Sequence, residues 1–268
     1  MLTSEPSISV AMITFNEEVN LPRTLSGLKW ANEIIIVDSG STDRTEDIAL
    51  SHGARFYVHR DFRGHGEQKN IAIRQCTSEW ILLLDADETV PEELASEIKA
   101  TIAHSTHDAY WIPRRNLFLT RWMQHGGLYP DLKLRLFRSG TTVMEEGVGP
   151  HSTPRFSGRT TGRLKHFMMH FAYPSFDGYL EHMNRYSSEV ASIRARDSST
   201  ATQVLLLRAL LNPMADFITN YVFRFGFLDA LEGLIFHFNH VFYVHWKYAK
   251  AWKARQTAAL LGLEVETR

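Results

Sequence analysis

Short apolar runs alternate with amphipathic segments along the first 105 residues of the chain. The runs are rich in β-branched residues and predict strands, and the segments between them show helical spacing. The expected strands cover residues 8–14, 33–37, 55–58 and 80–84. The expected helices begin near residues 21, 43, 67 and 91. Strands that alternate with helices in this way predict an α/β fold with a mostly parallel sheet.

The pattern changes after residue 105. Strands are expected at residues 110–114 and 133–137, and the second of these alternates apolar and basic positions. The aromatic, glycine-containing segment 118–130 between them is typical of a binding loop.

From residue 175 onward the spacing of apolar residues is helical. The expected helices cover residues 176–195, 203–211, 215–224 and 228–252. The second is expected to stop at Asn212-Pro213, because proline has no backbone N–H. The chain is therefore expected to consist of an α/β domain of residues 1–172 and a helical extension of residues 173–268.

Polar side chains follow the ends of several predicted strands. Asn16, Glu17, Asp38, Asp85 and Asp87 all occupy such positions. The carboxyl ends of parallel strands meet at one edge of the sheet, so these residues are expected to converge there. Clustered carboxylates repel one another unless a cation lies between them, and a hard divalent cation often binds phosphate too. The alternative is a solvated turn whose acidic residues lie near a helix N-terminus.

The composition limits the possible functions. Apolar residues make up 44 % of the 268, and 29 Lys and Arg balance 30 Asp and Glu, which gives no electrostatic case for nucleic acid. The single Cys76 allows no internal disulfide, which is typical of a reducing compartment. Residues 1–6 lack the pattern of a signal peptide, and no window reaches about 18 unbroken apolar residues. A cytoplasmic location is therefore expected.

Five short motifs carry a resemblance to a known family. They lie at residues 12–18, 36–43, 84–88, 129–137 and 224–229. With these motifs the chain resembles the family 2 glycosyltransferases with a GT-A fold. It is most similar to the bacterial branch that adds sugars to the lipopolysaccharide core or to related lipid-linked glycans.

The resemblance implies a Rossmann-like sheet flanked by helices, with a C-terminal helical extension. It also implies an inverting, metal-dependent hexosyltransferase. Its partners would be a nucleotide-sugar donor, with a UDP-sugar as the expected donor, and a glycan or lipid-linked acceptor in cell-envelope polysaccharide or lipopolysaccharide synthesis.

The same resemblance implies roles for individual residues. Those expected to contact the nucleotide sugar are Thr14, Asn16, Glu17, Asp38, Gln68, Lys69, Asn70, Asp85 and Ala86. Asp38 would bind the base or ribose, Asp85 would face the ribose, and Asp87 would hold the Mg²⁺ or Mn²⁺ ion that bridges the diphosphate. Lys69 could instead be a solvated helix residue, and Glu88 a supporting charge or a charge at a helix start.

An inverting displacement needs a base that takes the proton of the acceptor hydroxyl. The branch usually has a His-Glu pair here, but the matching residues are His151 and Ser152, so the glutamate is missing. The candidate bases are Glu146, Asp131 and Glu145, in that order of preference. His151 could be a base, a metal ligand, a phosphate donor or an ordinary loop histidine.

Two further features leave alternatives open. His166 and His170 are spaced as zinc ligands on a helix would be, but the apolar residues around them favour packing. The segment 204–252 interleaves aromatic and basic residues, which suits the surface of a membrane, such as the inner face of the bacterial inner membrane. Packing of these helices on the sheet domain is the alternative.

Two other functions compete with sugar transfer. A nucleotidyltransferase that makes nucleotide sugars would need a glycine-rich basic loop after the first strand, whereas residues 15–18 are Phe-Asn-Glu-Glu. A non-catalytic binding relative is suggested by the missing glutamate after His151, but the intact Asp85 and Asp87 argue against it.

Overall fold

The computed structural model describes residues 6–146, 153–197 and 199–261. The chain forms two compact units, each described here by itself. The sheet unit comprises Met1–Arg115 and Pro130–Phe171, and the helical unit comprises Asn116–Tyr129 and Ala172–Arg268. The functional division at residue 172 stays a prediction, because compact packing alone assigns no activity to either part.

Four parallel strands form one half of the main sheet. They are β1 (Ile8–Thr14), β2 (Glu33–Asp38), β3 (Arg55–Val58) and β4 (Trp80–Leu83), in the spatial order β3-β2-β1-β4. In the register of β1 with its neighbours, Thr14 lies beside Asp38 and Ala11 beside Leu83. The predicted parallel α/β sheet is therefore confirmed.

The other half of the main sheet is mixed. After β4 the order continues β8-β6-β12-β5, and β8 runs antiparallel to both β4 and β6. These strands are β8 (Asp131–Arg138), β6 (Ala109–Phe118), β12 (Met168–Tyr173) and β5 (Glu88–Thr89). The short β7 (Arg121–Trp122) and β11 (Thr161–Arg163) pair with β6, while β9 (Thr142–Met144) and β10 (Pro154–Phe156) form a separate hairpin.

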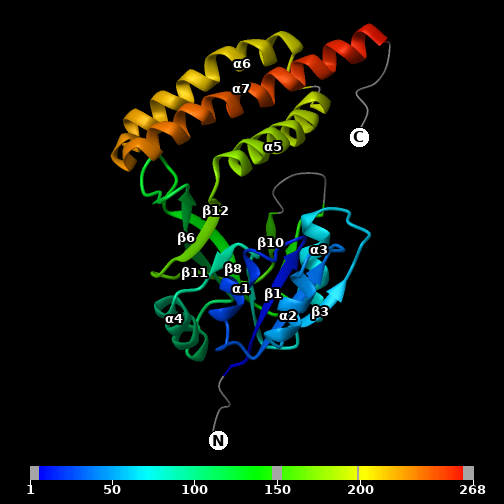
Figure 1. Ribbon diagram of the computed structural model, residues 1–268, viewed down its shortest axis with the longest axis vertical. Helices are drawn as coiled ribbons and strands as arrows, with labels where there is room; N and C mark the ends of the chain where they lie inside the picture. Colours follow the sequence, from blue (N-terminus) through cyan, green and yellow to red (C-terminus); the bar gives the residue numbers. More distant parts are fainter. Residues whose placement is uncertain (1–5, 147–152, 198, 262–268) are drawn as a thin grey trace, which may run out of the picture. The chain divides into compact units, whose positions relative to one another are not determined.

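Helices cover both faces of this sheet (Figure 1). They are α1 (Leu21–Ser26), α2 (Thr45–Ser51), α3 (His65–Gln75) and α4 (Glu92–Ala103). In β1, Val10 and Met12 belong to one apolar cluster, which includes residues of α1 and α4, while Ala11 belongs to a second cluster, which includes Ala72 of α3. Successive residues of a strand point to opposite faces, so a strand covered on both faces is apolar at nearly every position.

The helical unit is built from three long helices that run side by side in Figure 1. These are α5 (Phe176–Arg196), α6 (Thr202–Phe217) and α7 (Ala230–Leu261). A π-helical turn, η1 (Ile218–Phe223), and a 3₁₀ turn, η2 (Gly226–Asp229), connect α6 to α7. Small and apolar residues of all three helices form their shared core, for example Ala191, Ala209 and Ala251.

The expected end of a helix at Asn212-Pro213 is wrong, because α6 continues through Pro213 to Phe217. A proline inside a helix deprives the carbonyl four residues earlier of its usual donor. Here that carbonyl belongs to Ala209, and His245 Nδ1 of α7 lies 2.9 Å from its oxygen. The neighbouring helix thus supplies the donor that the proline lacks.

Asp229 fastens the segment 116–129 to the helices of its own unit. Its buried carboxylate accepts hydrogen bonds from the backbone N–H groups of Gln124 and His125, the latter at 2.8 Å, and lies 3.0 Å from His125 Nδ1. Gly126 has a φ of +66°, and a Cβ atom there would lie 2.0 Å from His237 Nε2. Only glycine fits this close approach.

Candidate active site

The ends of β1, β2 and β4 form one edge of the sheet and bring the predicted polar residues together. Thr14 and Asp38 are neighbours in the register, and the backbone N–H of Leu84 donates to Ala11 O at 3.0 Å. The sheet pairing therefore continues until the residue before Asp85. Carboxylates that follow adjacent strands of a parallel sheet lie where ligands of such folds commonly bind.

Asp38 is 1 % exposed and fully engaged within the protein. Its Oδ1 accepts from the N–H groups of Gly40 and Ser41, and its Oδ2 from the hydroxyl groups of Thr14 and Ser41, at 2.5–2.8 Å. A carboxylate has about four acceptor positions, so these donors use its capacity. Asp38 and Thr14 thus hold the loop after β2, and their contact with a nucleotide stays a prediction.

Asn16 connects the loops that follow β1 and β2. Its backbone has a φ of +55°, a left-handed conformation that asparagine tolerates better than most residues. The N–H of Asn16 donates to Ser41 Oγ at 2.8 Å, and its Oδ1 accepts from the N–H of Thr42 at 2.9 Å. Asn16 therefore shapes the edge of the site, whatever else it contacts.

Two cations hold Asp85. Lys69 Nζ lies 2.7 Å from Asp85 Oδ1, and Arg135 Nη2 donates to Asp85 Oδ2. Burial alone would raise the pKa of Asp85, but Arg135 and Lys69 hold it well below its usual range. The carboxylate is therefore ionised at neutral pH. Lys69 is only 9 % exposed, so the alternative of a solvated helix residue is wrong.

Glu88 is the centre of the buried network behind Asp85. Its fully buried Oε1 accepts from Arg114 Nη1 at 2.8 Å and from Arg135 Nη2 at 2.9 Å, and its Oε2 accepts from the N–H of Asp85 at 3.0 Å. Glu88 lies in β5 rather than at a helix start, so that alternative is wrong and the supporting role is what the contacts show. The network fixes the direction in which Asp85 points.

Asp87 faces His170, a residue for which the sequence favoured packing. His170 Nε2 lies 3.1 Å from Asp87 Oδ2, and the backbone N–H of Phe171 donates to Asp87 O at 2.9 Å. Burial raises the pKa of Asp87, but His170 outweighs it and the net shift is downward. The side chain of Asp87 is still 30 % exposed, so a ligand can reach it.

His166 and His170 do not form a zinc site. His170 belongs to the strand β12 and His166 precedes it, so neither lies on a helix, and His166 Nδ1 contacts Glu97 Oε2 at 2.8 Å. Within the described ranges, no three His, Cys, Asp or Glu residues are grouped as metal ligands would be. The spacing of the two histidines indicated that they could be metal ligands. In the structure His170 instead contacts Asp87, which lies 83 residues earlier in the sequence.

Asp87 and His170 nevertheless fit a divalent cation that is shared with a diphosphate. Mg²⁺ keeps several waters and is usually held by one or two carboxylates together with substrate phosphates, rather than by a cage of protein ligands. An ionised carboxylate oxygen beside an imidazole nitrogen is a donor set of this open kind. The absence of a larger cluster is therefore compatible with the expected metal.

The polar residues of α3 contact protein groups. Gln68 Nε2 donates to Ser39 Oγ at 2.8 Å and to His59 O at 3.0 Å. Asn70 bonds both backbone groups of Met144, at 2.8 and 2.9 Å. Ala86 is buried, and its carbonyl accepts from Thr24 Oγ1 at 2.7 Å. Direct contact of Gln68, Asn70 and Ala86 with the donor stays a prediction.

The candidate bases differ in what surrounds them. Glu146 Oε1 accepts from Asn70 Nδ2 at 2.9 Å, and no described residue forms an ion pair with it. Glu145 Oε1 accepts from Arg155 Nε at 2.8 Å. Asp131 is paired with Arg114 at 2.7 Å and with Lys133 at 3.0 Å. His151 lies outside the described residues.

These environments favour Glu146 over Asp131. Burial would raise the pKa of Asp131, but Arg114 and Lys133 hold it below its usual value, which weakens the carboxylate as a base. Glu146 is exposed and is positioned by Asn70. The segment that carries Glu145 and Glu146 packs closely against α3, since a Cβ atom at Gly66 of α3 would lie 2.0 Å from Glu145 O.

Glu17, at this edge of the sheet, has a carboxyl group whose pKa is raised. Burial raises its pKa from 4.5 to about 7, opposed by a hydrogen bond from Asn20 and reinforced by the charge of Asp87. A carboxyl whose pKa is raised on folding stabilises the protein while it is protonated. That stability is lost as pH rises from about 4.5 through 7.

A Glu17→Gln variant is expected to be more stable than the wild type at about pH 8, by up to about 3 kcal/mol, and equally stable near pH 4. Denaturant unfolding at both pH values measures the difference. Glu93→Gln, an exposed change in the first turn of α4, is the matched control and should show no such pH dependence. Equal stability of wild type and Glu17→Gln at both pH values would show that the pKa of Glu17 is not raised in the folded protein.

The sequence comparison identifies the family. The model of glycosyl transferase family 2 matches residues 9–166, more than half of the chain and all of the strand-end residues described above. The chain belongs to this family. An uncharacterized glycosyltransferase of Rickettsia typhi is 28 % identical over 244 residues, covering 86 % of this chain and 83 % of that protein.

A second relative confirms the resemblance to the lipopolysaccharide branch. The glycosyltransferase LpsC of Rhizobium meliloti, named for lipopolysaccharide core biosynthesis, is 27 % identical over 255 residues, covering 86 % of this chain and 89 % of LpsC. The solved structure of S. aureus TarS 1-349 in complex with UDP-GlcNAc has a TM-score of 0.51 at 16 % identity, covering 97 % of this chain and 93 % of that one. This likeness confirms the GT-A fold.

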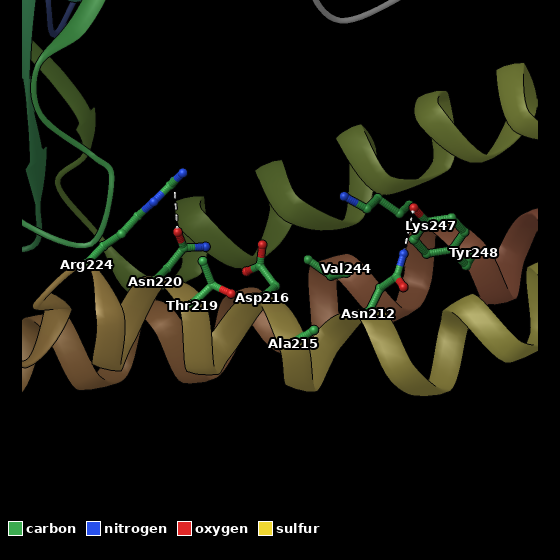
Figure 2. A pocket seen from close by; sticks show the side chains of 9 residues that line it. All are labelled: Asn212, Ala215, Asp216, Thr219, Asn220, Arg224, Val244, Lys247 and Tyr248. Atoms are coloured by element: carbon green, nitrogen blue, oxygen red, sulfur yellow. Dashed lines mark hydrogen bonds between the residues drawn. The ribbon is translucent and has the colours of Figure 1, made fainter.

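Two observations concern the helical unit. Among the described helices, none combines the length and the apolar character that crossing a membrane requires. A groove of about 390 Å³ lies along α6 and α7, lined by polar residues that include Asp216, Asn220, Arg224 and Lys247 (Figure 2). All of its lining residues belong to the helical unit, so it is described apart from the sheet edge.

Proposed function

We propose that this glycosyltransferase is an inverting, metal-dependent hexosyltransferase. It moves a sugar from a UDP-sugar to a glycan or lipid-linked acceptor in lipopolysaccharide or cell-envelope polysaccharide synthesis. The observation that carries the proposal is the ionised, accessible Asp87 beside His170 at the carboxyl edge of the sheet. The UDP-GlcNAc complex of TarS and the name of LpsC support the donor class and the pathway class.

The donor would bind along the edge formed by the loops after β1, β2 and β4. Asp85, oriented by Lys69 and Arg135, would accept hydrogen bonds from the ribose hydroxyl groups. Asp87 and His170 would hold the Mg²⁺ or Mn²⁺ ion. When bound, the ion neutralises the charge of the leaving diphosphate.

The transfer would be a single displacement. Glu146 takes the proton of the acceptor hydroxyl while the hydroxyl oxygen forms a bond to the anomeric carbon of the sugar. The bond from that carbon to the diphosphate oxygen breaks at the same time, and UDP leaves with the bonding electrons. The attacking oxygen approaches opposite the leaving group, so the anomeric configuration inverts.

A lipid-linked acceptor would require the enzyme to work at a membrane surface. We therefore propose that it is a peripheral protein on the cytoplasmic face of the bacterial inner membrane. Its helical unit, with the apolar and aromatic residues of α6 and α7, would provide the contact.

A thermal-shift screen of nucleotide sugars tests the donor assignment. UDP-sugars with Mn²⁺ are expected to raise the Tm by several degrees, because a ligand at about 100 times its Kd stabilises a protein by roughly 2.7 kcal/mol. GDP-sugars with Mn²⁺ and Mn²⁺ alone are the controls and should shift the Tm little. If no nucleotide sugar shifts the transition, the protein is a non-catalytic relative rather than a transferase.

A further inference from the structure

The helical unit exposes an unusually apolar face along α6 and η1. The exposed side chains recur every three or four residues, at Leu207, Leu210, Leu211, Met214, Ile218 and Val222. This spacing places them on one side of the helix. Leu210 and Leu211 are each 59 % exposed, so the stripe is not covered within the described structure.

A second stripe follows the first half of α7. It consists of Leu231, Leu234, Phe238 and Phe242, again at helical spacing and exposed. No Asp, Glu, Lys or Arg occurs between Glu232 and Lys247 in the sequence. After Glu232 this stripe therefore has no carboxylate, ammonium or guanidinium group of its own.

The two stripes run along the same length of the α6–α7 hairpin. α6 and α7 pack antiparallel, as shown by the contacts of Ala209 with His245 and of Asp216 with His240. This pairing sets Ile218 opposite Phe238 along the hairpin. We name the two stripes together with the connecting turn the apolar face.

The apolar face is separate from the polar groove of the same unit. Asn212 and Asp216 of α6 line the groove in Figure 2, and their spacing from Leu210 and Met214 puts them on the other side of the helix. The buried residues Leu205 and Ala209 also lie away from the stripe and pack against α7. Both helices have thus buried one side and left the other exposed.

The turn between the helices adds aromatic side chains at the end of the face. Phe223, Phe225 and Phe227 are exposed, Phe223 at 71 %. Phe225 has a φ of +59°, which is unfavourable for a bulky residue and persists only where surrounding contacts impose it. The carbonyl of the adjacent Arg224 accepts from Gly126 N–H at 2.9 Å, which anchors the turn.

The charges around the apolar face are positive on balance. The nearby acidic residues are already paired: Asp229 is buried against His125, and Glu232 contacts Arg121 at 3.1 Å. Arg208, next to the exposed Leu207, is itself exposed and forms no ion pair with a described residue, whereas Arg224 lines the polar groove and donates to Asn220 Oδ1 at 3.2 Å. An apolar helical face with aromatic residues and a flanking arginine is typical of proteins that lie in the headgroup region of an anionic bilayer.

We infer that the apolar face of the α6–α7 hairpin docks onto an anionic phospholipid membrane. Its exposed leucines and phenylalanines enter the boundary between headgroups and acyl chains, and Arg208 contacts a lipid phosphate. This inference deepens the proposed function, because it names the surface that would bring the enzyme to a lipid-linked acceptor.

Co-sedimentation of the full chain with phosphatidylethanolamine–phosphatidylglycerol vesicles tests this surface. The wild type is expected to sediment with the vesicles, and the double variant Leu210→Gln, Met214→Gln to bind at least about tenfold more weakly, a change of about 1.4 kcal/mol. Glutamine preserves helix propensity. Leu50→Gln on α2 is the matched control, since Leu50 is also exposed, at 54 %, but lies in the sheet unit, and its binding should not change.

The Tm shift with UDP-sugar and Mn²⁺ is measured in the same proteins, so that folding and donor binding are followed separately from membrane binding. A variant that keeps this shift is folded, and Phe223→Ser in the turn replaces the double variant if the latter loses it. The inference would be overturned if the wild type does not sediment with the vesicles, or if the variants bind them as strongly as the wild type does. Neither result would contradict the proposed donor. Conversion of a dimer to a monomer by the variants, with unchanged vesicle binding, would show that a second copy covers the face.

Discussion

An Asp87→Asn enzyme is expected to lose at least about a thousandfold of kcat/KM for sugar transfer while remaining folded. Asp87 is the carboxylate that faces His170 at the sheet edge, and neutralising it removes the negative charge that would hold the metal. Charge stabilisation by a metal contributes several kcal/mol to a transition state, and each 1.36 kcal/mol corresponds to a factor of ten in rate. Asparagine keeps the size of the side chain, and its oxygen can still contact His170.

The donor-induced Tm shift distinguishes this explanation from unfolding. In the wild type, Mn²⁺ should increase the shift produced by a UDP-sugar, and in Asp87→Asn it should not. Asp47→Asn makes the same chemical change at an exposed position of α2 and should leave both quantities unchanged. Wild-type activity in Asp87→Asn, or full activity of the wild type in excess EDTA, would contradict the metal assignment.

The fold followed from sequence wherever local periodicity decided the structure. The runs at β1, β2 and β4 are apolar at nearly every position because both faces of the sheet are covered, and this pattern is visible in the sequence. Pro213 was misjudged because its tolerance depends on a donor from another helix. His245 lies 36 residues away from Ala209 in the sequence, so no local sequence pattern predicts this hydrogen bond.

The site was predictable to the extent that strand ends define it. Asp85 and Asp87 follow β4 directly, which is a local signal. The partners of these carboxylates are not local: Arg135 lies 50 residues beyond Asp85, and His170 lies 83 residues beyond Asp87. Glu88 joins Arg114 and Arg135 only after β5, β6 and β8 have come together. Electrostatic partners of this kind depend on tertiary structure, which composition and spacing do not reveal.

Glu146→Gln is expected to lower kcat by about 10²- to 10⁴-fold with little change in donor binding. That range is the usual contribution of a general base. Glutamine can still accept the hydrogen bond from Asn70 Nδ2, so the position of the side chain and of the strand β9 should be preserved. Only the capacity to take a proton is removed. The variant should therefore keep the Tm shift with UDP-sugar and Mn²⁺.

Glu145→Gln is the control next to it in the chain. Glu145 is also exposed, but it is paired with Arg155 at 2.8 Å, so its loss should cost little activity. The large loss of kcat should appear in Glu146→Gln and not in Glu145→Gln, because only the base takes the proton of the acceptor hydroxyl. If Glu146→Gln turns over at the wild-type rate, the base lies elsewhere. Asp131→Asn is then the next variant, and wild-type turnover there as well would exclude both carboxylates.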